Sequence, residues 1–276
     1  MYKRQDTRVE TGRSGSRRLA LALEAHQPAK GNRFVYAGDT IVVTGGARGI
    51  TFEILKELVA GEPAHLVILG RSDLAALDPL FRPDSVDETF ILGELKKQMA
   101  NAKPVEVKRA VARIVGLKQT IANLEQLRTG GLTVDYHAVD VTDAAAVAAV
   151  LGRYDRIDGV IHAAGVEQSQ FIPKKEQAAF DQVFNTKILG ALNLFAGLRE
   201  RDYRFFIAFS SVTARFGNEG QVDYTGANDM LGKLVQREKL KSPDKVFKVL
   251  SWTAWEGAGM ACSGPVKTDT VLSSIV

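Results

Sequence analysis

A glycine-rich turn near the start of the chain constrains its fold more than any other feature. The β-branched run Ile41–Val43 enters the segment Thr44–Ile50, which holds three glycines, and an apolar stripe at helical spacing follows. A strand, a glycine turn and a helix in this order present backbone N–H groups at a helix N-terminus, where a phosphate can approach because glycine has no Cβ. We expect the turn to bind the pyrophosphate of a dinucleotide; the alternative is an ordinary tight turn. The expected contacts come from Thr44, Gly45, Gly46, Arg48, Gly49 and Ile50.

The alternation of strand, turn and helix continues along the chain. Strands are expected at 41–43, 66–69, 133–139, 159–161, 205–209 and 246–252. Six strands alternating with helices predict an α/β, Rossmann-type, doubly wound parallel sheet. Ligands of such sheets bind outside the carboxyl ends of the strands. The segments expected at those ends are Gly70-Arg71-Ser72, Asp140-Val141, Ala163-Ala164-Gly165 and Ser210-Ser211.

Composition excludes several classes of protein. The 276 residues are 45% apolar and 25% charged, which is typical of a globular chain. A net charge of +4 is too small to indicate nucleic-acid binding. The single cysteine, Cys262, excludes a disulfide framework, the four histidines lack metal-ligand spacing, and no apolar run is long enough for a membrane helix. We expect a cytoplasmic protein with no metal, nucleic-acid or membrane partner.

The end of the second expected strand distinguishes between cofactors. An acidic residue there would bind the ribose 2′-hydroxyl of NAD, but this chain has Arg71-Ser72 after Gly70. A guanidinium can grip a 2′-phosphate with two donors, and the serine hydroxyl adds a third. We therefore expect NADPH, with Arg48 as a second cation. The alternative is a surface arginine at the start of a loop.

A helical insertion, about residues 73–131, separates the second and third strands. Pro104 is a typical helix start and Gly130-Gly131 a typical stop, so the sequence predicts a helix over about 105–128. Its apolar residues follow a heptad pattern, which indicates either packing within the domain or a seam for a partner helix. The residues of this stripe are Val107, Ala110, Ile114, Leu117, Ile121 and Leu124.

The remaining chain suggests one catalytic domain with a different N-terminal segment. Residues 1–38 are rich in Arg, Ser and Gly, and we interpret them as a linker or a remnant of a preceding structural subdomain. Residues 39–276 are expected to form the catalytic domain.

Several motifs together resemble the short-chain dehydrogenase/reductase family. They are Thr44-Gly45 with Gly49, Asp140-Val141, Ala163-Ala164-Gly165, Ser211 and Tyr224. Most of that family has Lys four residues after the Tyr, whereas this chain has Asn228 there and Lys187 in the preceding helix. This exchange is characteristic of ketoreductase domains of polyketide and fatty-acid synthases, and the spacings of 24, 13 and 4 from Lys187 through Ser211 and Tyr224 to Asn228 match that subgroup. The segments 209–212, 217–221 and 252–260 also resemble it, and the insertion is similar to that of polyunsaturated fatty acid synthases.

The resemblance implies a catalytic role for each of four residues. Tyr224 would donate the proton, Lys187 would lower its pKa, Ser211 would hold the carbonyl oxygen and Asn228 would order a water chain. The substrate would be a 3-oxoacyl chain on the phosphopantetheine of an acyl carrier protein, within a multidomain synthase. Alternatives are a free-standing reductase of a small ketone or sugar, and a catalytically silent scaffold domain.

The chain also departs from the family pattern. Thr51 replaces the third glycine of the turn, Glu167-Gln168-Ser169 replaces the Leu-Asp-Asp triplet of one stereochemical class, and Phe216 replaces the Trp of the other. The configuration of the product therefore stays open. The family continues through a substrate lid beyond the position of Val276, so a truncated C-terminus is expected.

Overall fold

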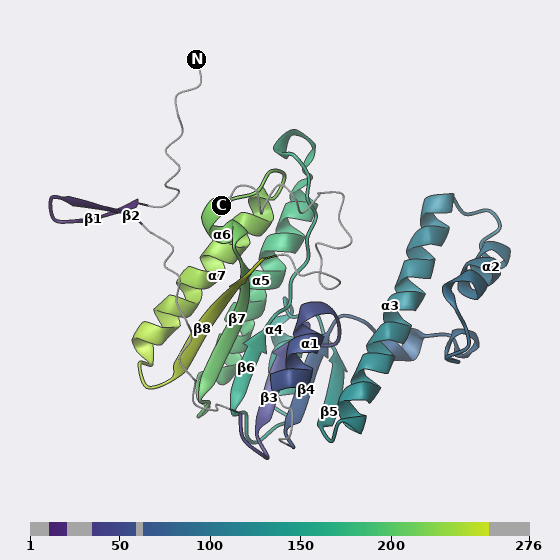
Figure 1. Cartoon of the computed structure of the whole chain (residues 1–276), viewed down its shortest axis with the longest axis horizontal. Coiled ribbons are helices and arrows are strands. Elements are labelled where there is room, and N and C mark those ends of the chain that lie inside the picture. Colours follow the sequence, from purple (N-terminus) through teal and green to yellow (C-terminus); the bar gives the residue numbers. More distant parts are fainter. Residues whose placement is uncertain (1–10, 21–34, 59–62, 254–276) are drawn as a thin grey trace.

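A parallel six-stranded sheet forms the centre of the molecule (Figure 1). The computed structural model describes residues 11–20, 35–58 and 63–253. The sheet order is β5-β4-β3-β6-β7-β8, so the chain starts in the middle and winds outward in both directions. This confirms the predicted doubly wound fold. The strands are β3 (Thr40–Thr44), β4 (His65–Gly70), β5 (Thr133–Ala138), β6 (Gly159–His162), β7 (Phe205–Ser211) and β8 (Val246–Trp252).

Helices cover both faces of the sheet (Figure 1). On one face α4, α5 and α7 contribute to the core, and on the other α1 and α3 do so. The α-helices are α1 (Gly49–Leu58), α2 (Glu88–Gln98), α3 (Pro104–Thr129), α4 (Ala144–Leu151), α5 (Gln177–Leu198), α6 (Thr213–Phe216) and α7 (Val222–Lys241); the short 3-10 turns are η1 (Leu74–Ala76), η2 (Pro79–Phe81) and η3 (Ile172–Lys174).

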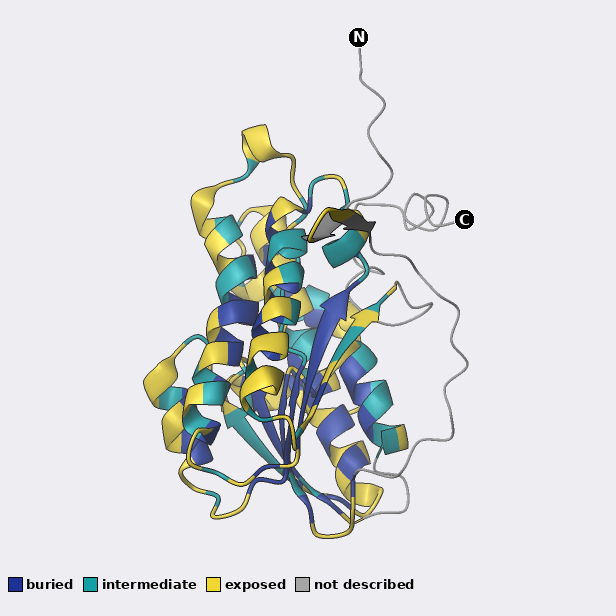
Figure 2. Ribbon diagram, turned by 90° about the vertical axis from the view of Figure 1, so that its left-hand side faces the viewer, coloured by how far each residue is buried: buried dark blue, intermediate teal, exposed yellow. Residues whose placement is uncertain are grey.

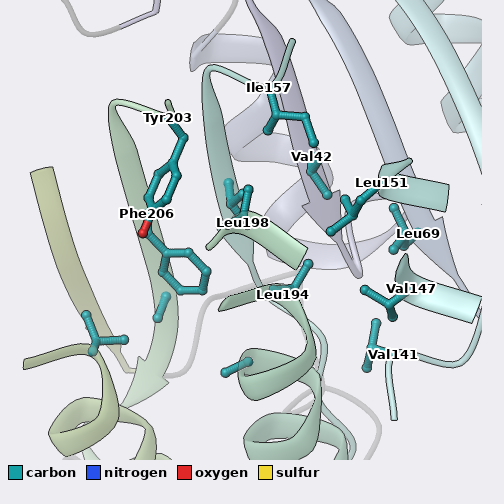
Figure 3. Packing of buried hydrophobic residues seen from close by; sticks show 14 of the residues in the cluster. Val42, Leu69, Val141, Val147, Leu151, Ile157, Leu194, Leu198, Tyr203 and Phe206 are labelled. Atoms are coloured by element: carbon teal, nitrogen blue, oxygen red, sulfur yellow. The ribbon is translucent and has the colours of Figure 1, made fainter. Parts of the chain in front are cut away.

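Strand residues alternate between two hydrophobic clusters. In β3, Val42 faces the cluster shared with α4, α5 and α7, whereas Ile41 and Val43 face the one shared with α1 and α3. Figure 3 shows the first cluster, in which Leu194 and Leu198 of α5 approach Phe206 and the strand residues beside it. Because both faces are covered, the central strands are largely apolar and deeply buried (Figure 2).

The insertion forms the predicted helix with a different buried face. Helix α3 begins at Pro104, and the Glu106 side chain accepts the Lys103 backbone N–H at 2.8 Å. The prediction that the whole heptad stripe is buried is wrong at Ile121, which is exposed. Ile114 is only half-buried. The physical reason is a change of partner along the helix. Val107, Val111 and Leu117 pack with α2, η1 and η2 in a third cluster, while Leu124 and Leu127 join the core of the sheet.

The N-terminal segment contains a small hairpin of its own. The strands β1 (Thr11–Ser14) and β2 (Arg17–Ala20) pair antiparallel within it. At the other end, most of the segment 252–260, with the chain end, lies outside the described residues. In the part of the chain that the structure describes, no helix combines the length and the apolar character needed to span a membrane.

Candidate active site

The glycine turn between β3 and α1 depends on two glycines with left-handed backbone conformations. Gly45 and Gly49 have φ of +72° and +62°, a region that favours glycine. A Cβ on Gly45 would lie 3.0 Å from both the Ala163 carbonyl oxygen and the Ala164 nitrogen. The turn therefore approaches the end of β6 backbone to backbone, and it leads directly into α1 at Gly49. This cradle fits a nicotinamide dinucleotide.

A chain of buried hydrogen bonds joins this turn to α5. Thr44 pairs with His162 in the register of β3 and β6, and Thr44 Oγ1 lies 2.8 Å from His162 Nδ1. The Ala164 N–H donates to Thr44 Oγ1 at 3.1 Å, and His162 Nε2 lies 2.9 Å from the Lys187 carbonyl oxygen. Because a carbonyl only accepts, we assign the proton to His162 Nε2. Burial and the Lys187 charge lower the pKa of His162 to about 4, so the ring is neutral.

The carboxyl ends of β4 and β5 provide the next part of the site. Arg71 is exposed at the end of β4, and the Tyr136 hydroxyl donates to the Ser72 carbonyl oxygen at 2.9 Å. Tyr136 covers the strand end closely, because a Cβ on Gly70 would lie 2.6 Å from its hydroxyl oxygen. After β5, Asp140 Oδ1 accepts the Thr142 N–H at 2.9 Å in a local turn, and Val141 is buried. These strand ends lie at the same edge as the glycine turn.

The four expected catalytic residues come from three neighbouring elements. Lys187 lies in α5, Ser211 ends β7, and Tyr224 and Asn228 are one turn apart in α7. The Lys187 ammonium donates to the Phe209 carbonyl oxygen at 2.8 Å, and a Cβ on Gly165 would lie 3.3 Å from Lys187 Nζ. Asn228 Nδ2 donates to the Tyr224 carbonyl oxygen at 2.8 Å. Among the described residues its Oδ1 is buried without a hydrogen-bond partner, so an acceptor is free beside the tyrosine.

The pKa values of the central groups follow from their burial. Burial lowers the pKa of Lys187 to about 8. Burial also raises the pKa of Tyr224, and the charge of Glu167 raises it further, while hydrogen bonds with Asn228 and Ser211 oppose both effects. Lys187 lies on the Phe209 carbonyl in this structure, so the groups that lower the pKa of Tyr224 are Asn228 and Ser211. Perturbed pKa values of this kind are typical of catalytic sites.

The sequence pattern missed a buried ion pair beside the tyrosine. Lys175 Nζ lies 2.6 Å from Asp223 Oδ2, and both side chains are at most 5% exposed. Lys175 also donates to the Gln168 carbonyl oxygen at 2.8 Å, and Asp223 Oδ1 accepts the Tyr224 N–H at 2.9 Å. The pair fastens the loop after β6 to the start of α7. Its two residues are 48 positions apart, and no local pattern connects them.

The residues at the position of the missing triplet also lie against α7. The Gln221 amide donates to Glu167 Oε1 at 2.7 Å and to Ser169 Oγ at 3.0 Å, and Ser169 donates to the same carboxylate. Gln221 lies three residues before Tyr224 and is buried. The loop after β6 is therefore joined to α7 through both this cluster and the Lys175–Asp223 ion pair. Gln221 belongs to a segment that resembled the family, but its partners were not predictable.

The doubly wound fold places the glycine turn and the ends of β4, β5, β6 and β7 at one edge of the sheet, where proteins of this fold bind dinucleotides. Comparison with known proteins identifies the family. The family model described as KR domain matches residues 39–257, and the chain belongs to this ketoreductase domain family, whose members reduce keto groups. The exchange of Lys187 and Asn228 is consistent with this membership.

Relatives of known sequence are large synthases. The chain is 30% identical over 252 residues to a polyunsaturated fatty acid synthase polypeptide of Thraustochytrium sp., covering 84% of this chain and 9% of that protein. It is 28% identical over 229 residues to 6-methylsalicylic acid synthase of Penicillium expansum, covering 81% of this chain and 11% of that protein. The chain thus spans about a tenth of the length of these relatives.

Solved structures share the fold. A ketoreductase domain from the bacillaene assembly line matches with a TM-score of 0.63 and 23% identity, covering 93% of this chain and 52% of that one. An A1-type ketoreductase matches with a TM-score of 0.64 and 24% identity, covering 92% of this chain and 45% of that one. At these identities the likeness establishes the fold and leaves substrate and stereochemistry open.

Proposed function

We propose that this domain uses NADPH to reduce a 3-oxoacyl thioester, carried on an acyl carrier protein, to the 3-hydroxyacyl product. The observation that carries the proposal is the gathering of Lys187, Ser211, Tyr224 and Asn228 beside the glycine turn, at the edge where doubly wound sheets bind their ligands. Membership of the ketoreductase domain family supports reduction of a ketone.

The preference for NADPH rests on two arginines, Arg48 in the glycine turn and Arg71 at the end of β4. Among the described residues, neither Arg48 nor Arg71 has a salt bridge or a hydrogen bond, so their donors are free. The positive charge of Arg48 acts on Tyr136, which is bonded to the Ser72 carbonyl beside Arg71. Two guanidinium groups without an acidic partner in the described part of the chain, on neighbouring strand ends of the cofactor edge, favour a 2′-phosphate over a ribose hydroxyl.

Each of the four side chains has a definite part in the proposed reaction. When bound, NADPH would supply the hydride for the carbonyl carbon, and the carbonyl oxygen would then carry negative charge. Ser211 and Tyr224 hold that oxygen by hydrogen bonds, and the Tyr224 hydroxyl donates the proton. The Lys187 ammonium stabilises the tyrosinate that results, and Asn228 Oδ1, a free acceptor, anchors the water that returns a proton to it.

The carrier-bound substrate is proposed from the relatives. Their printed names are those of fatty-acid and polyketide synthases, and this chain corresponds to a small part of each. A domain of such a synthase receives its acyl chain as a thioester on a carrier protein, so other synthase domains and the carrier are the expected partners. The same reasoning makes residues 39–276 one catalytic unit in our proposal, with the segment before it structural.

The test of activity is NADPH oxidation, followed by absorbance, with an acetoacetyl thioester and with trans-1-decalone. We expect reduction of both, and a faster reaction when the acetoacetyl group is on an acyl carrier protein. If a folded protein binds NADPH but oxidises it with neither substrate, the silent scaffold would be favoured. Reduction of the decalone alone would favour a free-standing ketone reductase.

The test of cofactor choice is the Arg71→Asp substitution. It removes a guanidinium donor and adds a negative charge, so we expect NADPH affinity to fall about 10- to 100-fold, with a much smaller change for NADH. Fluorescence titration of both dinucleotides measures the two constants. Equal losses for the two would contradict the assignment of Arg71 to the 2′-phosphate.

A further inference from the structure

One face of the insertion helix α3 lies against the glycine turn. Gly116, Thr120 and Asn123 are spaced four and three residues apart, so they share a single face of the helix. Thr120 and Asn123 are buried although they are polar, and they interrupt the apolar stripe that packs on either side of them. Buried polar side chains need partners, and this face meets the turn within residues 44–50.

Asn123 holds the glycine turn directly. Its Nδ2 donates to the Ala47 carbonyl oxygen at 2.9 Å, across 76 residues of sequence, and its Oδ1 accepts from Gln119 Nε2 at 2.7 Å. Ala47 is itself buried and immediately precedes Arg48. The hydrogen bond therefore fixes the backbone from which the Arg48 side chain extends.

Gly116 leaves a place for that side chain. A Cβ on Gly116 would lie 2.5 Å from a terminal nitrogen of Arg48, and the other atom within 4 Å is the central guanidinium carbon of the same arginine. The Thr120 hydroxyl donates to the Gly116 carbonyl at 2.8 Å. The guanidinium thus rests on the bare backbone of α3, at a residue that has no side chain.

The charge of Arg48 also acts on a group at the end of β4. Burial raises the pKa of the Tyr136 hydroxyl, and the positive charge of Arg48 partly opposes this effect. Tyr136 is bonded to the Ser72 carbonyl, next to Arg71. Arg48 therefore contacts α3, and its charge acts on the tyrosine at the strand end that we assign to the 2′-phosphate.

We propose that Gly116 and Asn123 are positioning residues of the cofactor site, and that this face of the insertion helix sets the selectivity for a 2′-phosphate by placing Arg48. This inference rests on the proposed use of NADPH. It adds α3 to the elements of the cofactor site, which otherwise come from the glycine turn and the strand ends. Gly116 directs the Arg48 guanidinium, and Asn123 holds the turn that binds the pyrophosphate.

The direct test is Gly116→Ala. The new methyl group displaces the end of a flexible side chain and not the backbone, and alanine is the better helix former, so we expect a melting temperature no lower than that of the wild type. We expect affinity for NADPH and for adenosine 2′,5′-bisphosphate to fall roughly 5- to 20-fold, and affinity for NADH and 5′-AMP to stay unchanged. Calorimetric titration of the four ligands measures this without any turnover.

Matched controls separate this effect from a general change in the insertion. Gly93→Ala in α2 adds a methyl where nothing lies within 4 Å, and it should change neither selectivity nor affinity. Asn123→Ala removes the anchor of the turn, and we expect weaker binding of NADPH and NADH alike, because both carry the pyrophosphate. Unchanged binding of both by a folded Asn123→Ala protein would overturn the role of Asn123.

The outcomes distinguish this proposal from the one on which it rests. A wild-type protein that binds NADH as tightly as NADPH would overturn the proposed cofactor itself. A wild type that prefers NADPH, loses the preference in Arg48→Ala and keeps it in Gly116→Ala would leave the cofactor assignment standing. That last result would overturn only the role of Gly116.

Discussion

The two halves of the site differ in how the fold holds their functional groups. In the cofactor half, formed by the ends of β3, β4 and β5, the arginines are exposed and the turn is shaped by glycines. In the catalytic half, formed by α5, β7 and α7, Lys187 is 3% exposed and Asn228 is fully buried. The comparison indicates that the two arginines can be changed with little effect on the fold, whereas the catalytic groups are part of the core. Substitution of an arginine in the cofactor half should therefore change cofactor binding without changing stability. Substitution of a buried group in the catalytic half should change both activity and stability.

The largest expected effect is that of Tyr224→Phe in the catalytic half. The substitution removes only the hydroxyl, so the fold and NADPH affinity should stay as in the wild type. Loss of a positioned proton donor lowers the rate by about 10²- to 10⁴-fold. Initial rates with a saturating acetoacetyl thioester, read beside a cofactor titration, test this. Appreciable activity in the variant would mean that another group donates the proton.

Lys187→Met should lower activity by a comparable factor while stabilising the protein. Burial lowers the pKa of Lys187 from 10.5 to about 8, so between these pH values the folded protein binds fewer protons than the unfolded chain. The resulting destabilisation is fully present below pH 8 and disappears as the pH rises through 10.5. Allowing for the lost hydrogen bond to Phe209, we expect the free energy of unfolding to rise by about 1–3 kcal/mol at neutral pH.

Two measurements check the Lys187 prediction. Denaturant unfolding should give a difference between variant and wild type that shrinks as the pH increases from 8 towards 10.5. The pH–rate profile of the variant should move to higher pH, because an uncharged side chain no longer favours tyrosinate. Adding Asn228→Lys to Lys187→Met should not restore full activity, since the free Asn228 acceptor is lost. An unshifted profile at an undiminished rate would exclude Lys187 from the reaction.

Breaking the buried Lys175–Asp223 pair should have a smaller effect on chemistry and a clear effect on stability. Lys175→Met leaves the Asp223 carboxylate buried without its cation, which typically costs about 3–5 kcal/mol. Lys175→Arg should recover part of the loss. We expect kcat/KM for the keto substrate to fall more than NADPH affinity, because Asp223 also bonds the Tyr224 N–H. Equal losses in both would show that the pair supports the whole domain and not the tyrosine in particular.

The smallest effect is expected in the insertion, from a pair of matched substitutions. Ile114 is half-buried in the α2–α3 cluster and Ile121 is exposed on the same helix. Ile114→Asp should lower the free energy of unfolding by about 1–3 kcal/mol, whereas Ile121→Asp should change it by about 0.5 kcal/mol or less. Chemical denaturation with size-exclusion chromatography measures both. If Ile121→Asp instead dissociated an oligomer, the stripe would be a seam for a partner helix.

Local sequence patterns were sufficient for much of the architecture. The six strands, the position of the glycine turn and the extent of α3 follow from periodicity and from helix start and stop residues, all within a few residues of the observed bounds. The apolar pattern of α3 did not predict the exposure of Ile121. The helix packs on α2 in its first half and on the sheet in its second, so its buried face changes along its length. A heptad count assumes one partner along the whole helix, and this helix has two.

The groups to which we assign the proposed chemistry could all be predicted from motifs and spacing: the glycines of the turn, Arg71 at a strand end, and Lys187, Ser211, Tyr224 and Asn228. What holds those groups in place became visible in the folded molecule. Lys175 meets Asp223 across 48 residues, Asn123 meets Ala47 across 76, and Arg48 rests on Gly116. Residue spacing reports which side chains share one face of one element. Which faces then meet depends on the packing of whole elements, and that packing is the sum of many weak apolar contacts spread over the entire chain.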